Sequence, residues 1–373
     1  MRLLSLQVQN YRNITAAELT PGRELTVICG NNGQGKTNLL EAIWLLTGGK
    51  SFRGGKDAEL IRRGEDFAVL DAVTRREEFE AEAPADPVRV RMTIGAPGSA
   101  RPGRTASVDG AAPKRATALA GSFPAVVFDP GHLSLVKGAP EGRRRFLDAA
   151  LCQLYPGYLA VYRRYVRVLQ QKNALLRRAP EGGERPFAEK CALLEVLNRD
   201  LALQGEQVQQ RRREYLRLLV PIACANYAEL SHGAERLELR YAAQFEPGNL
   251  AQLLAEKRDL ELRAGQSLYG PHREDLELLL DGQPAKIYAS QGQQRSAVLS
   301  LKMAEAAAAA RITGEHPVLL LDDVLSELDE SRKQYLLTRM REKQTFVTSC
   351  DDTAFLKTDG EVYRMEGGVL TKA

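Results

Sequence analysis

A glycine-rich segment near the N-terminus has the residue types that bind nucleoside triphosphates. Residues 30–37 read GNNGQGKT and fit the pattern G-x-x-x-x-G-K-[ST]. In this pattern backbone N–H groups close around the phosphates, the lysine neutralises the β- and γ-phosphates, and the hydroxyl is a ligand for Mg²⁺. An apolar run precedes the segment and a helical pattern over residues 38–47 follows it, as a P-loop requires. We therefore expect an ATP site formed by Gly30, Asn31, Asn32, Gly33, Gln34, Gly35, Lys36, Thr37 and Asn38, with Lys36 also acting in catalysis.

A second apolar run ends in two carboxylates, Asp322 and Asp323. Such a run alone is weak evidence, because buried strands often end in acidic residues, but beside a P-loop it predicts a Walker B strand. Asp322 is expected to hold Mg²⁺ together with Thr37. Asp323 is placed to orient or deprotonate the attacking water and is the predicted catalytic carboxylate.

The elements that must position these residues come from both ends of the chain. Lys36 and Asp322 lie 286 positions apart. Strand-like patterns occur at 4–8, 25–29, 67–70, 88–94, 125–128, 237–241, 318–321 and 345–348, and residues 96–113 suggest a turn-rich hairpin or loop. The patterns around the Asp281-Gly282 turn, at 276–280 and 285–288, predict a hairpin, and residues 293–312 predict a helix.

The middle of the chain has helical spacing instead. Apolar residues recur at helical intervals from residue 142 to 219, with a break at residues 179–186, which predicts two antiparallel helices. The expected fold class is α/β: a P-loop ATPase head of residues 1–140 and 235–373, with a helical arm of residues 141–234 inserted into it.

Composition excludes several classes of protein. No apolar run approaches the roughly 20 residues that span a bilayer, and the N-terminus suggests no signal peptide. The five cysteines form no Cys-x-x-Cys pair and the four histidines have no metal-ligand spacing, so we expect no disulfide framework and no zinc site. Buried thiols in a reducing cytoplasm are the simpler interpretation.

Positive charge is concentrated in the predicted arm. Residues 141–234 contain 16 Lys and Arg against 10 Asp and Glu, while the whole chain has a net charge of +4. This excess fits a solvated helical surface and a nucleic-acid surface about equally well, and the same two alternatives apply to Arg211, Arg212 and Arg213. The cluster of Tyr158, Tyr162 and Tyr165 favours helix packing over base stacking. His272 and Arg273 are expected at a turn, where they could support nucleotide or DNA.

Further motifs resemble those of a known family. Residues 289–295, ASQGQQR, are similar to the signature of ABC-type ATPases, and residues 325–329, LSELD, to their D-loop. Residues 10–13 (NYRN), 50–53 (KSFR), 138–148 (GAPEGRRRFLD), 270–273 (GPHR) and 321–329 (LDDVLSELD) resemble the RecF family of ABC/SMC-type ATPases. These motifs extend over the whole chain in the family's order.

The resemblance implies a function beyond the ATP site. It implies an ATP-dependent homodimer of the bacterial cytoplasm that binds double-stranded and gapped DNA near single-strand junctions and acts with RecR and RecO to load recombinase. ATP and Mg²⁺ are the implied cofactors. The signature residues Ser290, Gly292 and Gln293 would bind the γ-phosphate held by the other subunit, because Ser290 opens a helix whose N–H groups attract anions.

Three positions depart from the usual ABC-type pattern. The signature has Ala289 and Gln291 in place of Leu and Gly, Asp323 stands where Glu is usual, and Ser349 aligns with the switch histidine to within one residue. These departures predict slow ATP hydrolysis, and the family resemblance implies that DNA stimulates it. Two alternative functions predict other patterns: the ATPase subunit of a membrane transporter predicts a shorter distance between the P-loop and Walker B, and an SMC-like structural protein needs a far longer coiled coil.

Overall fold

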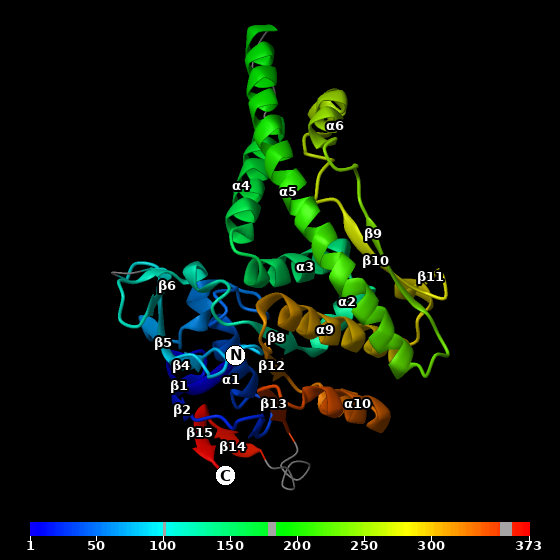
Figure 1. Ribbon diagram of the computed structural model, residues 1–373. Helices are drawn as coiled ribbons and strands as arrows, with labels where there is room; N and C mark the ends of the chain where they lie inside the picture. Colours follow the sequence, from blue (N-terminus) through cyan, green and yellow to red (C-terminus); the bar gives the residue numbers. More distant parts are fainter. Residues whose placement is uncertain (100–101, 178–183, 351–359) are drawn as a thin grey trace.

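A computed structural model describes residues 1–99, 102–177, 184–350 and 360–373, apart from the side chains of residues 184–186 (Figure 1). Two six-stranded sheets form the lower part of the molecule, and a pair of long helices rises from it. The N- and C-termini both lie in the lower part, near one another in this view.

The central sheet interleaves strands from both ends of the chain. Its order is β15-β14-β3-β13-β12-β8, and the five strands from β14 to β8 run parallel. The members are β3 (Leu25–Cys29), β8 (Ala125–Phe128), β12 (Val318–Leu321), β13 (Thr345–Ser349), β14 (Glu361–Glu366) and β15 (Val369–Lys372). This sheet confirms the prediction of a head built from N- and C-terminal lobes.

A second, antiparallel sheet packs over helix α1 (Lys36–Leu45), whose side chains are mostly buried between the sheets. Its order is β2-β1-β4-β5-β6-β7. The strands are β1 (Arg2–Tyr11), β2 (Ile14–Leu19), β4 (Phe67–Arg75), β5 (Val88–Gly95), β6 (Gly103–Val108) and β7 (Lys114–Arg115). The turn-rich segment at 96–113 thus contains a six-residue strand, β6, paired with β5; the many turn residues obscured its alternation.

The rising helices form the predicted antiparallel pair, with unequal lengths. Helix α3 (Pro140–Leu154) leads into α4 (Tyr158–Arg177), which packs against α5 (Glu184–Leu230). Most of the predicted break lies outside the described residues, and α5 already begins at Glu184. At 47 residues α5 is more than twice the length of α4, so its C-terminal half packs against other elements, chiefly α9 (Gln291–Thr313).

A small antiparallel sheet and several short helices complete the arm. The sheet order is β11-β10-β9, with β9 (Leu237–Ala242), β10 (Asp275–Leu280) and β11 (Gln283–Pro284). The hairpin prediction was wrong at 285–288, because the returning strand has only two residues and α8 (Ala285–Tyr288) follows it. The other short helices here are α2 (Ser134–Lys137), α6 (Leu250–Glu256) and α7 (Arg258–Ala264), whereas α10 (Glu330–Met340) packs against the central sheet.

One apolar cluster continues from the long helices into β9, β10 and α9. The predicted division of the chain at residues 141 and 234 stays a prediction, but packing does not change at residue 234. Helix α9 joins the two parts of the molecule, since Leu301 and Ala304 pack in the arm cluster while Leu299 and Met303 pack under the central sheet. Its helix-favouring alanines and its left-handed C-cap glycine, Gly314, explain the local structure.

Candidate nucleotide-binding site

The P-loop leaves β3 and enters α1 through glycines that no other residue can replace without strain. Gly30 has φ +146° and Gly35 has φ +116°. A Cβ atom on Gly30 would lie 2.3 Å from the carbonyl oxygen of Met365, and one on Gly35 would lie 2.8 Å from Oδ1 of Asn13. The loop is therefore held in close contact with neighbouring backbone and side chains, and its shape depends on both glycines.

Residues on the rim of the loop fix it to other segments. Asn31, Asn32 and Gly33 are exposed. The backbone oxygen and Oε1 of Gln34 accept hydrogen bonds from Gly368 and Gly367 at 3.1 and 2.5 Å. Nδ2 of Asn38 donates to Oδ1 of Asn13 at 2.7 Å, and Nδ2 of Asn13 donates to the oxygen of Gly33 at 3.2 Å. The NYRN segment therefore braces the loop from outside.

Lys36 begins α1 and folds back across the loop. Its Nζ donates to the backbone oxygens of Gly30 at 2.5 Å and Asn31 at 3.0 Å, and lies 3.3 Å from Sγ of Cys350. Cys350 is exposed, so the interpretation of all five cysteines as buried thiols was wrong at this position. The Lys36 ammonium group therefore lies at the mouth of the loop, where a phosphate would bind.

Thr37 and Asp322 meet at the edge of the central sheet where its parallel strands end. Thr37 Oγ1 donates to Asp322 Oδ1 at 2.8 Å, and Thr348 Oγ1 donates to the same oxygen at 2.9 Å. Burial raises the pKa of Asp322, and the two hydroxyl hydrogen bonds oppose that rise. Because Mg²⁺ prefers oxygen ligands and usually takes only one or two from protein carboxylates, this pair fits the ion.

Asp323 turns away from the strand that precedes it. Its φ of +51° is a left-handed conformation that Asp tolerates, and its N–H donates to Thr348 Oγ1 at 2.9 Å. Ser326 Oγ donates to the backbone oxygen of Asp323 at 2.7 Å and lies 3.2 Å from Oδ1. The carboxylate is thus held at the end of β12, partly exposed and next to Asp322.

Ser349 ends β13 and belongs to the same edge of the sheet. Its backbone oxygen accepts from the N–H of Gly30 at 3.2 Å. Ser349, which aligns with the switch position of ABC-type ATPases, is therefore adjacent to the P-loop. Its role as the switch residue stays a prediction.

Sequence reasoning missed Asp129, which follows β8. The N–H of Asp322 donates to the oxygen of Phe128 at 2.9 Å, so Asp129 follows the strand that pairs with Walker B. Burial raises the pKa of Asp129, and the negative charge of Asp322 adds to the rise. Asp129 therefore places a second carboxylate near Asp322, the residue predicted to hold Mg²⁺. Only the pairing of β8 with β12, which the sequence does not encode locally, reveals this neighbour.

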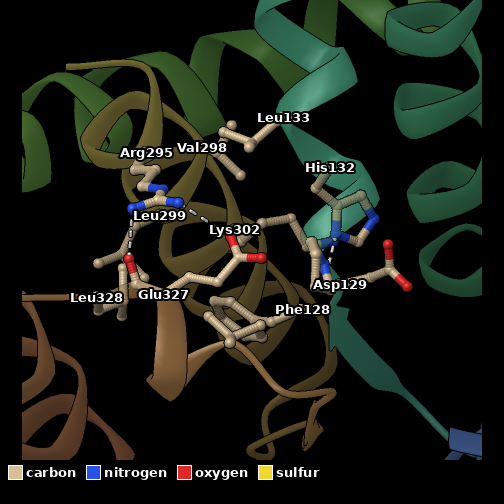
Figure 2. Close-up of a pocket in the computed structure, with 12 residues that line it drawn as sticks. Phe128, Asp129, His132, Leu133, Arg295, Val298, Leu299, Lys302, Glu327 and Leu328 are labelled. Carbon is tan, nitrogen blue, oxygen red and sulfur yellow. Dashed lines mark hydrogen bonds and ion pairs between the residues drawn. The ribbon is translucent and has the colours of Figure 1, made fainter. Parts of the chain in front are cut away.

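A small cavity of about 40 Å³ lies behind these strand ends, between β8, α9 and the D-loop (Figure 2). His132 Nδ1 accepts from the N–H of Asp129 at 3.0 Å, and burial lowers the pKa of His132 well below its usual value. Across the cavity Arg295 donates to the backbone oxygen of Glu327 at 2.7 Å. The Arg295 contact therefore holds the D-loop against α9 at the edge of this partly open cavity.

A buried carboxylate joins two of the quoted motifs. Glu41 on α1 accepts from Tyr11 OH at 2.8 Å, from Ser51 Oγ at 2.5 Å and from Arg12. Burial alone would raise the pKa of Glu41, but these hydrogen bonds hold it below its usual value. The NYRN and KSFR segments are therefore fixed to the helix that follows the P-loop.

Arg53, the last residue of KSFR, was given no separate role by sequence reasoning. Its Nη1 donates to Oδ1 of Asn38 at 2.6 Å. Its positive charge opposes the rise that burial causes in the pKa of both Asp322 and Asp129. The exposed guanidinium therefore lies near both carboxylates, on the side of the P-loop.

The signature motif forms a helix N-terminus of its own. Ser290 is the N-cap of α9: its Oγ accepts from Gln293 N at 3.2 Å, and its N–H donates to Oε1 of Gln293 at 2.5 Å. Ser290 is exposed, and Gly292 and Gln293 are half-buried. Among the described residues, no hydrogen bond links these three to the P-loop. The structure thus brings the P-loop and Walker B together, and leaves the signature outside that cluster.

The arm's polar residues are mostly paired within the chain. Arg212 is 2% exposed, and its guanidinium binds both carboxylate oxygens of Asp148 at 2.9 Å, so both interpretations of Arg212 as a surface residue were wrong. Arg211 is exposed and pairs with Glu214 at 2.7 Å. Other ion pairs from residues 141–234 include Arg143–Asp275, Arg145–Glu141, Arg164–Asp200 and Lys172–Glu261.

The tyrosine cluster and the GPHR turn are part of the arm's core. Tyr158 and Tyr165 are buried and Tyr162 packs beside them, which confirms helix packing. Tyr165 OH lies 2.6 Å from Nδ1 of His272, and burial lowers the pKa of His272 to about 4. Arg273 donates to the oxygen of Ser267 at 2.9 Å. These bonds give both residues structural partners.

Comparison with known proteins agrees with this geometry. The family described as RecF/RecN/SMC N terminal domain matches residues 2–368. The DNA replication and repair protein RecF of Heliobacterium modesticaldum is 38% identical, with 100% of each chain covered. The chain belongs to the RecF family. The RecF of Anaeromyxobacter sp. is 39% identical over 100% of this chain and 99% of that protein.

Solved structures agree as well. The recombination mediator protein RecF of the RecFOR pathway, in a structure named RecF-ATP, is 31% identical with a TM-score of 0.87, covering 100% of this chain and 97% of that one. The Smc head domain from Pyrococcus furiosus, at 16% identity and a TM-score of 0.55, shares the fold over 100% of this chain and 95% of its own. The predicted RecF family, head fold and ABC/SMC-type ATPase are confirmed. Within the described residues, no helix is both long enough and apolar enough to cross a membrane.

Proposed function

We propose that this protein is an ATP-dependent homodimer that binds double-stranded DNA and releases it on hydrolysis, in the cytoplasm. The observation that carries the proposal is the 2.8 Å hydrogen bond from Thr37 to Asp322, which joins the P-loop to Walker B. Ser290 of the signature motif is exposed and takes no part in this contact. The P-loop and Walker B form one half of an ATP site. The signature of a second copy would supply the other half.

Exposed apolar residues support a second copy at the signature. Ile287 and Tyr288, next to Ser290, are 71% and 66% exposed. Large apolar side chains this exposed favour an interface. With two copies facing each other, Ser290, Gly292 and Gln293 of one chain would receive the γ-phosphate of ATP in the P-loop of the other, through the N-terminal N–H groups of α9.

Different residues of the chain would bind the phosphates, hold Mg²⁺ and orient the attacking water. Lys36 and the loop N–H groups bind the phosphates, and Arg53 adds positive charge from the KSFR side. Thr37 and Asp322 would hold Mg²⁺, which neutralises charge developing on the transferred phosphoryl group. Asp323 would orient the attacking water. Because Asp is one methylene shorter than Glu, and Ser349 offers a hydroxyl in place of an imidazole, we expect slow turnover. Since the relatives are DNA replication and repair proteins, we expect DNA to stimulate it.

The proposed DNA contacts are to phosphates. The relatives are DNA replication and repair proteins, and the solved RecF belongs to the RecFOR pathway. On this basis we propose binding to duplex DNA near the junctions of gaps, with RecR and RecO as partners in recombinase loading. Among the described residues Arg167, Arg199 and Arg217 are exposed and in no ion pair, which makes them better candidates than Arg212.

The test is duplex binding with and without nucleotide. Fluorescence anisotropy with ATP should show an association constant that falls steeply with salt, with a log–log slope of about −0.9 for each DNA phosphate that the protein neutralises. Lys36→Met should lose the part of the DNA affinity that depends on ATP. Equal DNA affinity with ATP, with ADP and in Lys36→Met would contradict the proposal, and so would hydrolysis that DNA leaves unchanged, as expected of a transporter subunit.

A further inference from the structure

The signature motif is connected by side chains to the end of the longest helix. Gln293 Nε2 donates to Glu235 Oε1 at 2.7 Å, and Tyr227 OH donates to Glu235 Oε2 at 2.5 Å. Tyr227 belongs to the last turn of α5 and is 0% exposed. One carboxylate therefore bridges the signature of α9 and the C-terminal turn of α5.

The bridge determines which way the Gln293 amide points. A glutamine amide has an acceptor oxygen at one end and a donor nitrogen at the other. Glu235 can only accept from the nitrogen, so the oxygen is directed to the N–H of Ser290, 2.5 Å away. That bond is one half of the capping box, whose other half is the bond from Gln293 N to the Ser290 hydroxyl at 3.2 Å.

Glu235 is itself held in place on its backbone side. It lies between the end of α5 and the start of β9, and its backbone oxygen accepts from Ser231 Oγ at 3.3 Å. Further along the same contact, Asn226 Nδ2 donates to the oxygen of Ser300 on α9 at 3.3 Å. These hydrogen bonds connect the C-terminal part of α5 to the N-terminal half of α9. We therefore expect a movement of α5 to move Ser290 through Glu235.

We propose that Glu235, oriented by Tyr227, is a positioning residue for the signature motif and couples it to the helical arm. The inference rests on the proposed use of the signature by the ATP of the other subunit. Glu235 touches no nucleotide in this scheme. It acts through Gln293 by fixing the direction in which the Ser290 hydroxyl and the first N–H groups of α9 face the partner.

The proposal predicts an asymmetric effect in a heterodimer. A Lys36→Met chain donates a working signature but no P-loop, and a Ser290→Arg chain donates a working P-loop but no signature. An equal mixture of the two forms one complete site per heterodimer. Glu235→Ala in the signature donor should lower hydrolysis by about ten- to hundredfold, because small misplacements of catalytic groups cost that much.

Glu235→Ala in the P-loop donor, the Ser290→Arg chain, is the matched control. It has the same effect on folding stability, but it lies next to a signature that the complete site does not use. Hydrolysis there should stay within about twofold of the unsubstituted mixture. Equal losses in the two placements, or none in either, would overturn the role of Glu235. No activity in the unsubstituted mixture would instead refute the proposed trans arrangement itself.

Conservative variants separate positioning from packing. Glu235→Gln keeps an acceptor oxygen for Gln293 and should recover most of the activity that Glu235→Ala loses, whereas Tyr227→Phe removes only the hydroxyl and should lower kcat several-fold with KM for ATP unchanged. Glu238→Ala, on β9, removes two weak ion pairs at 3.8 Å, with Arg236 and Arg240, and should match wild type. A Glu235→Gln as inactive as Glu235→Ala, or a Tyr227→Phe that raised KM alone, would contradict the mechanism.

Discussion

Arg212 offers the sharpest test of how the arm is stabilised. Its guanidinium binds both oxygens of Asp148 at 2.9 Å and the backbone oxygen of Pro271 at 2.7 Å. Both side chains of this pair are nearly inaccessible, at 2% and 6%. Arg212→Ala would leave the buried Asp148 carboxylate without a positive partner, though still bonded to Tyr158, and in comparable pairs this costs about 3–5 kcal/mol of unfolding free energy.

Arg211→Ala is the matched control, one residue away on the same helix. Its ion pair with Glu214 is exposed, so its loss should cost less than about 1 kcal/mol. Urea unfolding followed by circular dichroism would measure both midpoints. Because domains are stable by only about 5–15 kcal/mol, Arg212→Ala should unfold at a clearly lower urea concentration. Equal midpoints for the two variants would refute the buried-pair interpretation.

Three further variants test the nucleotide site and the arm. Asp323→Asn should keep ATP binding through Asp322 yet lose hydrolysis by about a hundredfold or more, and it should dissociate from DNA more slowly than wild type at saturating ATP; hydrolysis at the wild-type rate would exclude Asp323 as the catalytic carboxylate. Gly30→Ala combines a φ of +146° with a Cβ 2.3 Å from a backbone oxygen, so it should weaken ATP binding, measured by titration, more than Gly33→Ala. Gly33→Ala has the strain of a φ of +80° but its Cβ meets nothing within 4 Å, and equal losses would contradict the loop geometry. Burial lowers the pKa of His272 to about 4, so the stability this residue contributes is complete above its unfolded pKa of about 6.5 and is lost as pH falls towards 4, by up to about 3 kcal/mol. His272→Gln should flatten the pH dependence of the unfolding midpoint in that window, and an unchanged profile would refute the assignment.

The sequence predicted those parts of the molecule whose signals are local. The P-loop and the LLLDD strand each carry their own pattern, and Thr37 and Asp322 do meet as expected. The helical arm was also visible, because a long amphipathic helix repeats its signal many times. The helix α8 was missed because four residues carry too little periodicity to separate a helical turn from a strand.

The parts that could not be predicted depend on pairing between distant segments. Asp129 comes near Asp322 only because β8 pairs with β12. Arg212 looks like its exposed neighbour Arg211 until the fold places Asp148 against it, 64 residues away. Glu235 has no motif at all, and only the packing of α5 on α9 brings it to the signature. Sequence spacing carries no information about such pairings.

The central claim is that ATP joins two copies of the chain through the signature. Sedimentation velocity on wild type and on Ser290→Arg, each with and without ATP, tests it most directly. Wild type should shift from monomer to dimer on adding ATP, and Ser290→Arg should bind ATP with wild-type affinity yet remain a monomer. A Ser290→Arg chain that dimerised on ATP as well as wild type would contradict the account.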